Sequence, residues 1–387
     1  MSSVNPTRGE PALEAFETPC LLVDLAKLDR NIAAMHNRLR RHQVGFRPHA
    51  KTAKNANIVR RMIAGGPDAI TVSSLAEAEY FFRRGMRDLL YAVGIVPAKL
   101  DRVADLRREG ADITIVLDDP DVAGRVAQRG KERNCRFPVL IEIDCDGERA
   151  GIVPGNPELI AVGRALHFSQ GAELRGVMTH AGGSYHGRSP GDHRAMAERE
   201  RSAAVGAADG LAEAGLPCPV VSVGSTPTAF FGTSFHGVTE VRAGVFAFGD
   251  LTMTGLGVCS PADIALSVLT RVIAAQRDRH RLIVDAGWTA LSRDLSTKDH
   301  AVDYRYGLVC DARGDPISDL IVTDTNQEHG IVASRAGGPL PERTFGVGDL
   351  LRILPVHACA TASGHSAYRV LDPGSETIAS WERCAGW

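Results

Sequence analysis

The stretch "AITVSSLAEAEYFFRRGMRDLLYAV" (69–93) decides the fold class. Its two ends, 69–74 and 88–93, are short apolar runs typical of strands that are buried on both faces. Between them, "LAEAEYFFRRG" (75–85) has the apolar spacing of a helix and ends on a glycine, as helices often do. A strand, a helix and a second strand in this order indicate a βαβ unit and a parallel sheet.

The same alternation extends in both directions from this stretch. A long helical pattern, 194–215, also ends on a glycine. Seven or eight such units in about 230 residues favour a (β/α)8 barrel of the TIM type. An open Rossmann sheet is disfavoured because no G-x-G-x-x-G follows the first strand. The other predicted strands are 20–25, 44–49, 112–118, 138–144, 174–180, 220–225 and 240–248.

The pattern changes after about residue 262, where short β-type runs alternate with Gly, Asp and Pro turns. This region predicts a second domain made mostly of antiparallel strands. The predicted organisation is an N-terminal arm (1–17), a barrel (18–261) and a β-rich domain (262–387).

Composition excludes several classes of protein. The chain has 387 residues, a net charge of −2 and no long run of one sign, which argues against nucleic acid or a membrane surface as partner. No segment approaches the ~18 apolar residues of a membrane span. The N-terminus lacks the apolar core of a secretory signal. The eight scattered cysteines, without a C-x-x-C pair, indicate reduced thiols and a cytoplasmic protein.

Polar motifs fall at the ends of the predicted barrel strands, where the active sites of such barrels lie. Five strands carry one, and five motifs with compatible chemistry are harder to dismiss than a single polar loop. They are "RPHAK" (47–51), "EIDCDGERAG" (142–151), "THAGGSYH" (179–186), "GSTPT" (224–228) and "EVRAG" (240–244).

Together these motifs offer what pyridoxal phosphate requires: a phosphate cradle, an aromatic neighbour and a lysine. Lys51 can form a Schiff base with an aldehyde. The other candidates are the Gly224 amide with Ser225 and Thr226 for phosphate, Gly244 for close backbone approach, Arg149 and Arg242 for fixed charge, and Tyr185 beside a ring. In the plainer interpretation Lys51 is a solvated surface charge, "GSTPT" is a turn, and Arg242 pairs with Glu240 or another carboxylate.

Two segments, "ETPCLLVDLAKLDRNIAAM" (17–35) and "GFRPHAKTAK" (45–54), resemble the start of the fold-type III, alanine-racemase-like pyridoxal phosphate enzymes. The similarity is to the branch with D-serine dehydratases, D-threo-3-hydroxyaspartate dehydratases and D-threonine aldolases, and in particular to the 3-hydroxyaspartate dehydratases. It covers residues 18–387. Besides the strand-end motifs it includes "VDAGW" (284–288), "NQEHGI" (326–331) and "LRILPVHACATA" (351–362).

The resemblance implies a role for each matching residue. Lys51 carries the cofactor, Arg149 contacts its phenolic oxygen, and Arg242 faces the ring nitrogen and leaves it unprotonated. The phosphate contacts implied are Ser225, Thr226, Gly244 and Val245, and Tyr185 lies near the cofactor. One departure is visible: Ala53 stands where many members of the family have a histidine.

His357 and Cys359 are two residues apart, which on a strand puts both side chains on one face. Imidazole and thiolate together favour zinc or a similar divalent metal. The resemblance implies a metal pair here, with H-x-C in the dehydratases and H-x-D in the aldolases. Zinc is therefore expected, with manganese, cobalt or magnesium as alternatives.

The expected function is a pyridoxal phosphate- and metal-dependent dehydratase acting on a D-3-hydroxy amino acid. D-threo-3-hydroxyaspartate would give oxaloacetate and ammonia, and D-serine would give pyruvate. The alternatives are a D-threonine or 3-hydroxy-D-aspartate aldolase, an amino-acid racemase, and a non-enzymatic pyridoxal phosphate carrier. The resemblance also implies a homodimer.

Overall fold

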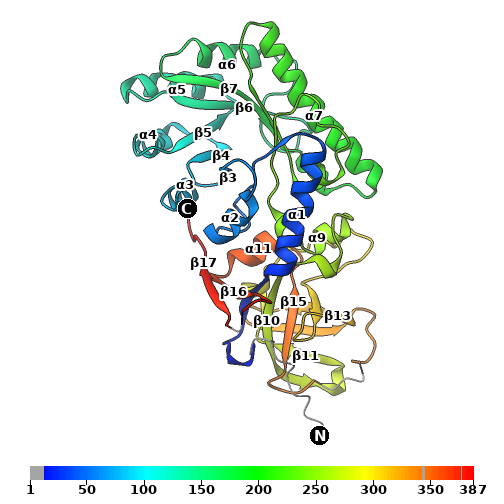
Figure 1. Ribbon diagram of the computed structural model, residues 1–387. Helices are drawn as coiled ribbons and strands as arrows, with labels where there is room; N and C mark the ends of the chain where they lie inside the picture. Colours follow the sequence, from blue (N-terminus) through cyan, green and yellow to red (C-terminus); the bar gives the residue numbers. More distant parts are fainter. Residues whose placement is uncertain (1–12, 342–344, 376) are drawn as a thin grey trace. The chain divides into compact units, whose positions relative to one another are not determined.

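The computed structural model describes residues 13–341, 345–375 and 377–387 (Figure 1). Its contacts form two compact units. The barrel unit comprises residues 34–244 with Gly386 and Trp387, and the β-rich unit comprises the described residues up to Ala33 with 245–385. The sequence placed the border after residue 261, so the contacts assign 245–261 differently. Where each functional domain begins and ends stays a prediction. Residues 1–12 of the predicted N-terminal arm (1–17) lie outside the described residues.

The barrel unit is built on an eight-stranded parallel sheet with the order β2-β9-β8-β7-β6-β5-β4-β3. A parallel bridge between His49 and Thr71 links the segment after β2 to β3, so the two edges of the sheet meet. The predicted TIM-type barrel is confirmed. Its strands are β2 (Gly45–Phe46), β3 (Ala69–Val72), β4 (Asp88–Gly94), β5 (Asp112–Leu117), β6 (Phe137–Ile143), β7 (Ala172–Thr179), β8 (Val220–Val223) and β9 (Glu240–Val241).

Helices connect these strands, as Figure 1 shows. Several begin with a side-chain cap and end at a glycine: Ser74 accepts a hydrogen bond from the Glu77 amide at the start of α3, and Gly85 and Gly215 have positive φ after α3 and α7. The connecting helices are α2 (Ala56–Ile63), α3 (Leu75–Phe82), α4 (Leu100–Arg108), α5 (Pro120–Glu132), α6 (Glu158–His167), α7 (Pro190–Glu213) and α8 (Thr226–Phe231), and α1 (Leu25–Arg41) precedes β2.

The β-rich unit contains a nine-stranded sheet with the order β11-β14-β13-β12-β15-β10-β1-β16-β17. All its pairs are antiparallel except β1 with β16, and β11 also pairs with β10, which closes six strands into a ring. The predicted antiparallel domain is confirmed. Its strands are β1 (Cys20–Asp24), β10 (Leu266–Gln276), β11 (Arg281–Val284), β12 (Leu308–Cys310), β13 (Pro316–Thr325), β14 (Gly330–Ser334), β15 (Leu350–Leu354), β16 (Ala367–Leu371) and β17 (Ala379–Glu382). Three short helices accompany them: α9 (Leu251–Gly255), α10 (Trp288–Leu291) and α11 (Ala358–Ser363).

The first predicted barrel strand, 20–25, belongs to the other sheet. β1 pairs with β10 and β16, not with a barrel strand. Its central residues Leu21, Leu22 and Val23 are fully buried. A strand buried on both faces has the same apolar pattern in either sheet, so its sequence could not assign it.

Each unit has apolar packing of its own. In the barrel unit, Leu90, Val116, Leu140 and Met178 form a buried cluster from four neighbouring strands. In the β-rich unit a larger cluster contains Leu251, Ile264, Leu308, Cys310, Ile321, Leu354 and Val356. Within the described residues, each helix is too short or too polar to cross a membrane.

Candidate active site

Lys51 follows a segment that backbone hydrogen bonds fix between two strands. The His49 amide donates to the Ala243 carbonyl at 2.8 Å, and the Ala50 amide donates to the Thr71 carbonyl at 2.8 Å. The Lys51 amide then donates to His49 Nδ1 at 3.3 Å. These hydrogen bonds fix the backbone position of Lys51 at the edge of the barrel sheet, and Lys51 is exposed.

His180, directly after β7, brings the predicted cations together. Burial, together with the charges of Arg149, Lys51 and Arg242, lowers its pKa to about 3. These three side chains come from three different strand ends. Because the charge of each acts on the same imidazole, all three lie near His180. The imidazole is neutral at ordinary pH.

A hydrogen bond fixes the tautomer of His180. Its Nδ1 lies 2.9 Å from the Gly224 carbonyl, which can only accept, so Nδ1 carries the proton and Nε2 is an acceptor. The Tyr185 ring lies 6.4 Å from the imidazole, centroid to centroid. His180 lies within the motif "THAGGSYH" (179–186), but the sequence did not predict it as a site residue. Its position between a strand end and a glycine pair was the available signal.

Arg242 is 3% exposed and is held by neutral acceptors. Its Nη1 donates to Ser222 Oγ at 2.5 Å, and its Nη2 donates to the Thr179 carbonyl at 2.5 Å. Burial lowers the pKa of this guanidinium. Glu240, the partner in the plainer interpretation, is instead bound by Arg47 at 2.8 Å. Among the described residues, Glu240, Glu200 and Glu142 act on Arg242 through their charges, while its direct hydrogen bonds go to neutral groups.

The predicted phosphate positions lie at the ends of β8 and β9, which are neighbours in the sheet. Gly224 has a φ of +134°, and a Cβ there would lie 2.2 Å from the Arg242 carbonyl oxygen. A Cβ on Gly244 would lie 3.0 Å from the His49 carbonyl oxygen. Gly224 therefore requires glycine, and at Gly244 a side chain would press on its neighbour; such close backbone packing suits an anion cradle.

Ser225 and Thr226 begin α8. The Ser225 side chain accepts the Thr228 amide at 3.1 Å, and both Ser225 and Thr226 are buried. Val245, the remaining predicted phosphate contact, begins a short 3-10 turn (Val245–Ala247) in the β-rich unit.

Glu200 is a buried carboxylate on α7 that the sequence did not single out. It is 1% exposed and accepts the Ala181 amide at 2.9 Å. It also bonds the Gly224 backbone and the Thr228 side chain, and burial raises its pKa. One side chain thus ties the ends of β7 and β8 together. The charge-rich helix pattern around it is typical of a solvated face, so no sequence signal marked it.

The metal pair lies in the β-rich unit but not on a strand. β15 ends at Leu354, His357 is the N-cap of α11, and Cys359 lies in the first turn of that helix. The prediction of a strand was wrong because Pro355 follows the strand and the chain turns into a helix. The two side chains nevertheless meet, through a hydrogen bond between His357 and Cys359.

Asp294 completes this group and was not predicted. Its Oδ2 lies 2.5 Å from His357 Nδ1. The hydrogen bond from His357 lowers the pKa of Asp294 to about 2. Burial lowers the pKa of His357, but its bonds to Asp294 and Cys359 outweigh burial and raise that pKa to about 11. A carboxylate on Nδ1 leaves Nε2 as the ring atom that can bind a metal.

The donor set fits a divalent metal. Imidazole nitrogen and cysteine sulfur are zinc ligands, and Asp250 Oδ2 fixes the turn between them by accepting the Ala358 amide at 2.9 Å. Within the described part of the chain, no cluster of three or more His, Cys, Asp or Glu side chains could hold a metal.

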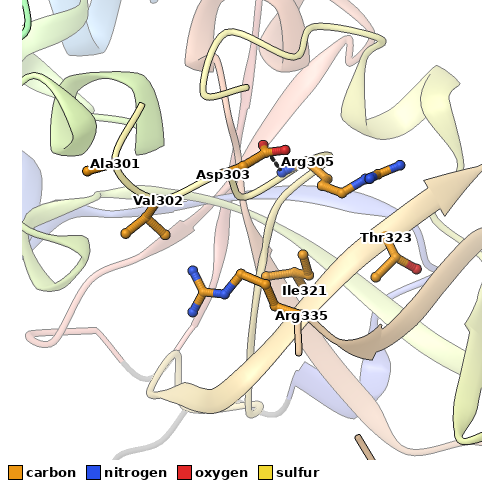
Figure 2. Close-up of a pocket in the computed structure, with 7 residues that line it drawn as sticks. All are labelled: Ala301, Val302, Asp303, Arg305, Ile321, Thr323 and Arg335. Carbon is orange, nitrogen blue, oxygen red and sulfur yellow. Dashed lines mark hydrogen bonds between the residues drawn. The ribbon is translucent and has the colours of Figure 1, made fainter. Parts of the chain in front are cut away.

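The β-rich unit also has a cavity of about 620 Å³ (Figure 2). Its two guanidinium groups, those of Arg305 and Arg335, point in opposite directions in this view, so they do not converge on one anion. Arg335 also pairs with Asp319 at 3.3 Å. The cavity contains none of the predicted site residues; it is lined by Ala301, Val302, Asp303, Arg305, Ile321, Thr323 and Arg335.

Comparison with known families assigns both parts of the chain. Residues 23–252 match the family model described as alanine racemase, N-terminal domain. The chain belongs to the alanine-racemase-like, fold-type III family. Residues 265–371 match a second family model, a putative serine dehydratase domain, which places the chain in the dehydratase branch of that family.

Characterised members of this alanine-racemase-like family are similar over nearly the whole chain. The D-threo-3-hydroxyaspartate dehydratase of Delftia sp. (strain HT23) is 46% identical, over 98% of this chain and 100% of that protein. The D-serine dehydratase of Dictyostelium discoideum is 28% identical, over 96% and 98%. A solved structure of a cysteine-to-alanine mutant of D-threo-3-hydroxyaspartate dehydratase, in the metal-free form, matches with a TM-score of 0.95, 45% identity, and coverage of 98% and 100%.

Proposed function

We propose that this protein is a pyridoxal phosphate- and divalent metal-dependent dehydratase. Its preferred substrate is D-threo-3-hydroxyaspartate, which yields oxaloacetate and ammonia, and D-serine would yield pyruvate. The observation that carries the proposal is Cys359 hydrogen-bonded to His357, whose Nδ1 is held by Asp294. The 46% identity to a dehydratase of that substrate supports it.

The barrel unit supplies the residues that would hold the cofactor. Lys51 would bind it covalently, Arg149 would contact its phenolic oxygen, and Arg242 would face the ring nitrogen. Pyridoxal phosphate supplies an electron sink for the substrate Cα. The phosphate would be bound by Gly224, Ser225, Thr226, Gly244 and Val245, with Tyr185 as a neighbour.

Lys51 Nζ is the proposed base that removes the Cα proton. Its amine would act on the substrate as a base as well as serving as the attachment point of the cofactor. Three cations near His180 favour an anionic substrate and cofactor in this region, and the neutral imidazole adds an acceptor at Nε2.

Loss of hydroxide is the energetic obstacle, because hydroxide is a poor leaving group. His357 Nε2 and Cys359 Sγ would hold the metal, which would supply Lewis-acid activation for departure of the 3-hydroxyl. We propose zinc, because borderline-soft donors favour it over magnesium, with manganese and cobalt as substitutes. The products balance: water leaves, the resulting enamine becomes an imine, and hydrolysis returns that water to give the 2-oxo acid and ammonia.

We further propose a cytoplasmic homodimer. All eight cysteines are free thiols, which is typical of a reducing compartment. The homodimer rests on the resemblance to the family.

A coupled ammonia assay across D- and L-3-hydroxy amino acids tests the function. D-threo-3-hydroxyaspartate should release ammonia and oxaloacetate. A chelator should abolish this release, while the bound pyridoxal phosphate keeps the protein yellow. Cys359→Ala should behave like chelated enzyme, and zinc, manganese or cobalt should restore the chelated wild type to different degrees. Full ammonia release from metal-free protein would overturn the metal's role.

The second candidate is an aldolase, in which the Cα–Cβ bond breaks and glycine and an aldehyde form without ammonia. Cys359 disfavours it, since the resemblance links H-x-D to the aldolases. Cys359→Asp installs that pair, and we expect lower elimination with at most a trace of glycine. Glycine as the main product of the unaltered enzyme would favour the aldolase.

A further inference from the structure

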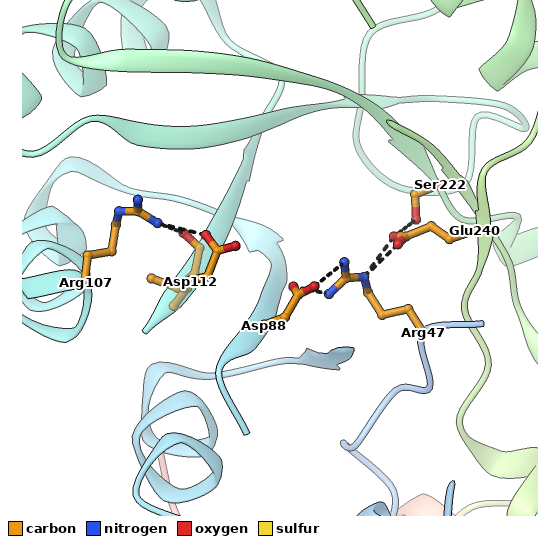
Figure 3. Close-up of polar contacts among 7 residues, drawn as sticks. Arg47, Asp88, Arg107, Asp112, Ser222 and Glu240 are labelled. Carbon is orange, nitrogen blue, oxygen red and sulfur yellow. Dashed lines mark hydrogen bonds and ion pairs between the residues drawn. The ribbon is translucent and has the colours of Figure 1, made fainter. Parts of the chain in front are cut away.

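Arg47 opens the motif that carries Lys51, yet neither the cofactor nor the metal accounts for it. Figure 3 shows its guanidinium between two carboxylates from different strands. Nη1 lies 2.6 Å from Asp88 Oδ1, and Nε lies 2.8 Å and 3.0 Å from the two oxygens of Glu240. Asp88 begins β4 and Glu240 begins β9, so Arg47 fixes the Glu240 carboxylate from one side.

A second hydrogen bond reaches the same carboxylate from β8. Ser222 Oγ, which is fully buried, donates to Glu240 Oε1 at 2.6 Å. Because a carboxylate can only accept, the single hydroxyl proton of Ser222 is committed to Glu240. The lone pairs of Ser222 Oγ therefore face its other neighbour, Arg242 Nη1, at 2.5 Å.

The result is a continuous chain with alternating charge. It runs from Asp88, whose side chain is 43% exposed, through Arg47 and Glu240 to the buried Arg242. Ser222 is the neutral member of this chain. Its hydroxyl carries no charge but orients the Arg242 guanidinium relative to the Glu240 carboxylate. Glu240 also lies two residues before Arg242 on the same face of the chain. A buried arginine without a carboxylate in direct contact is thus compensated one hydrogen bond away.

We propose that Glu240, acting through Ser222, positions the Arg242 guanidinium, and that Arg47 holds Glu240 in the orientation this requires. Arg47 and Glu240 are positioning residues in this assignment and do not themselves contact the reacting atoms. The inference rests on the proposed function in one respect, that Arg242 faces the ring nitrogen of the cofactor.

The alternative is that Arg47 only ties strands together. The two possibilities differ in what they do to the ring nitrogen. A correctly placed Arg242 cation keeps that nitrogen unprotonated, because a second positive charge beside it is unfavourable. A displaced guanidinium relaxes this constraint, whereas simple loosening of the barrel would lower stability without changing the protonation state.

The test uses the full-length protein loaded with pyridoxal phosphate that carries an NMR-active isotope in its ring nitrogen. Wild type and Ser222→Thr, which keeps the hydroxyl, should show the chemical shift of an unprotonated nitrogen. Ser222→Ala and Glu240→Leu, which removes the oxygen that accepts from Ser222, should shift the signal toward the protonated form, whereas Glu240→Gln, which keeps that oxygen, should resemble wild type. Asp88→Asn, at the exposed end of the chain, is the matched control and should resemble wild type.

The outcomes separate the two proposals. A protonated nitrogen in wild type would defeat the placement of Arg242 and with it that part of the proposed function. An unprotonated nitrogen in wild type and in both Ser222→Ala and Glu240→Leu would defeat the positioning role alone. If Ser222→Ala fails to fold, Glu240→Leu decides, because it removes the acceptor of the Ser222 hydroxyl and leaves Ser222 and Arg242 in place.

Discussion

The barrel unit and the β-rich unit build their candidate sites in opposite ways. In the barrel unit, Lys51, Arg149 and Arg242 come from strand ends far apart in sequence and lie around His180. In the β-rich unit, His357 and Cys359 are two residues apart at the start of one short helix, with Asp294 as the one distant addition. The first group depends on closure of the barrel sheet, and the second depends mainly on a local turn.

This difference indicates which substitutions should disrupt each site. The barrel group is supported by buried polar side chains such as Glu200 and Ser222, so its geometry is distributed over many contacts. The metal pair has one supporting carboxylate on the imidazole, and its local turn is fixed by Asp250. We therefore expect cofactor binding and metal binding to respond independently to substitution.

The largest expected effect breaks the barrel group at its covalent anchor. Lys51→Ala should lose all borohydride-reducible cofactor, because no other side chain is proposed to form the Schiff base. Its metal content should equal that of wild type. Lys54→Ala, three residues further and paired with Glu77 at 3.2 Å, is the control and should keep the adduct. An adduct that survives in Lys51→Ala would reject the assignment of Lys51.

The next effect tests the other side of the comparison. Asp294→Asn should weaken metal affinity about 10–100-fold, as loss of a carboxylate behind a metal-binding histidine generally does. Cofactor attachment should not change. Titration against a competing chelator measures the affinity, and Asp299→Asn, a nearby exposed aspartate, is the matched control. Equal affinities for both variants would show that Asp294 does not support the metal.

A smaller effect is expected at the phosphate cradle. Gly244→Val should weaken pyridoxal phosphate binding by about tenfold, or about 1.4 kcal/mol, since a Cβ there presses on the His49 carbonyl at 3.0 Å. Gly94→Val is the control, because a Cβ at that strand end meets no atom within 4 Å. Cofactor titration by absorbance compares them, and wild-type affinity in Gly244→Val would place the phosphate elsewhere.

The smallest effect concerns His180 in the cofactor-free protein. Its pKa is 6.5 in an unfolded chain and about 3 in the folded one, so the unfolded chain takes up the proton first as pH falls. The stability it contributes is complete above pH 6.5 and declines toward pH 3. Wild type should lose about 0.7 kcal/mol between pH 7 and pH 6 from this group. Urea unfolding of wild type and His180→Gln at both pH values measures it, and identical pH responses would contradict a buried neutral imidazole.

Much of the fold followed from sequence because its signals are local. The alternation of apolar runs and helical patterns identified the barrel, and the change after residue 262 identified the antiparallel sheet. Strand β1 was misassigned because burial on both faces looks the same in either sheet. The helix at His357 was missed because two residues are too few to show a period.

The sequence by itself determined the chemistry of this protein: a lysine at a strand end, arginines and glycines after other strands, and an imidazole beside a thiol. These are properties of residue type and spacing, and the family resemblance rests on them. Only the tertiary structure decided which polar side chains support that chemistry. Glu200, Ser222, Asp294 and the pairing of Arg47 with Glu240 are recognisable only once burial has removed water, because a buried polar group must then find its partner within the protein.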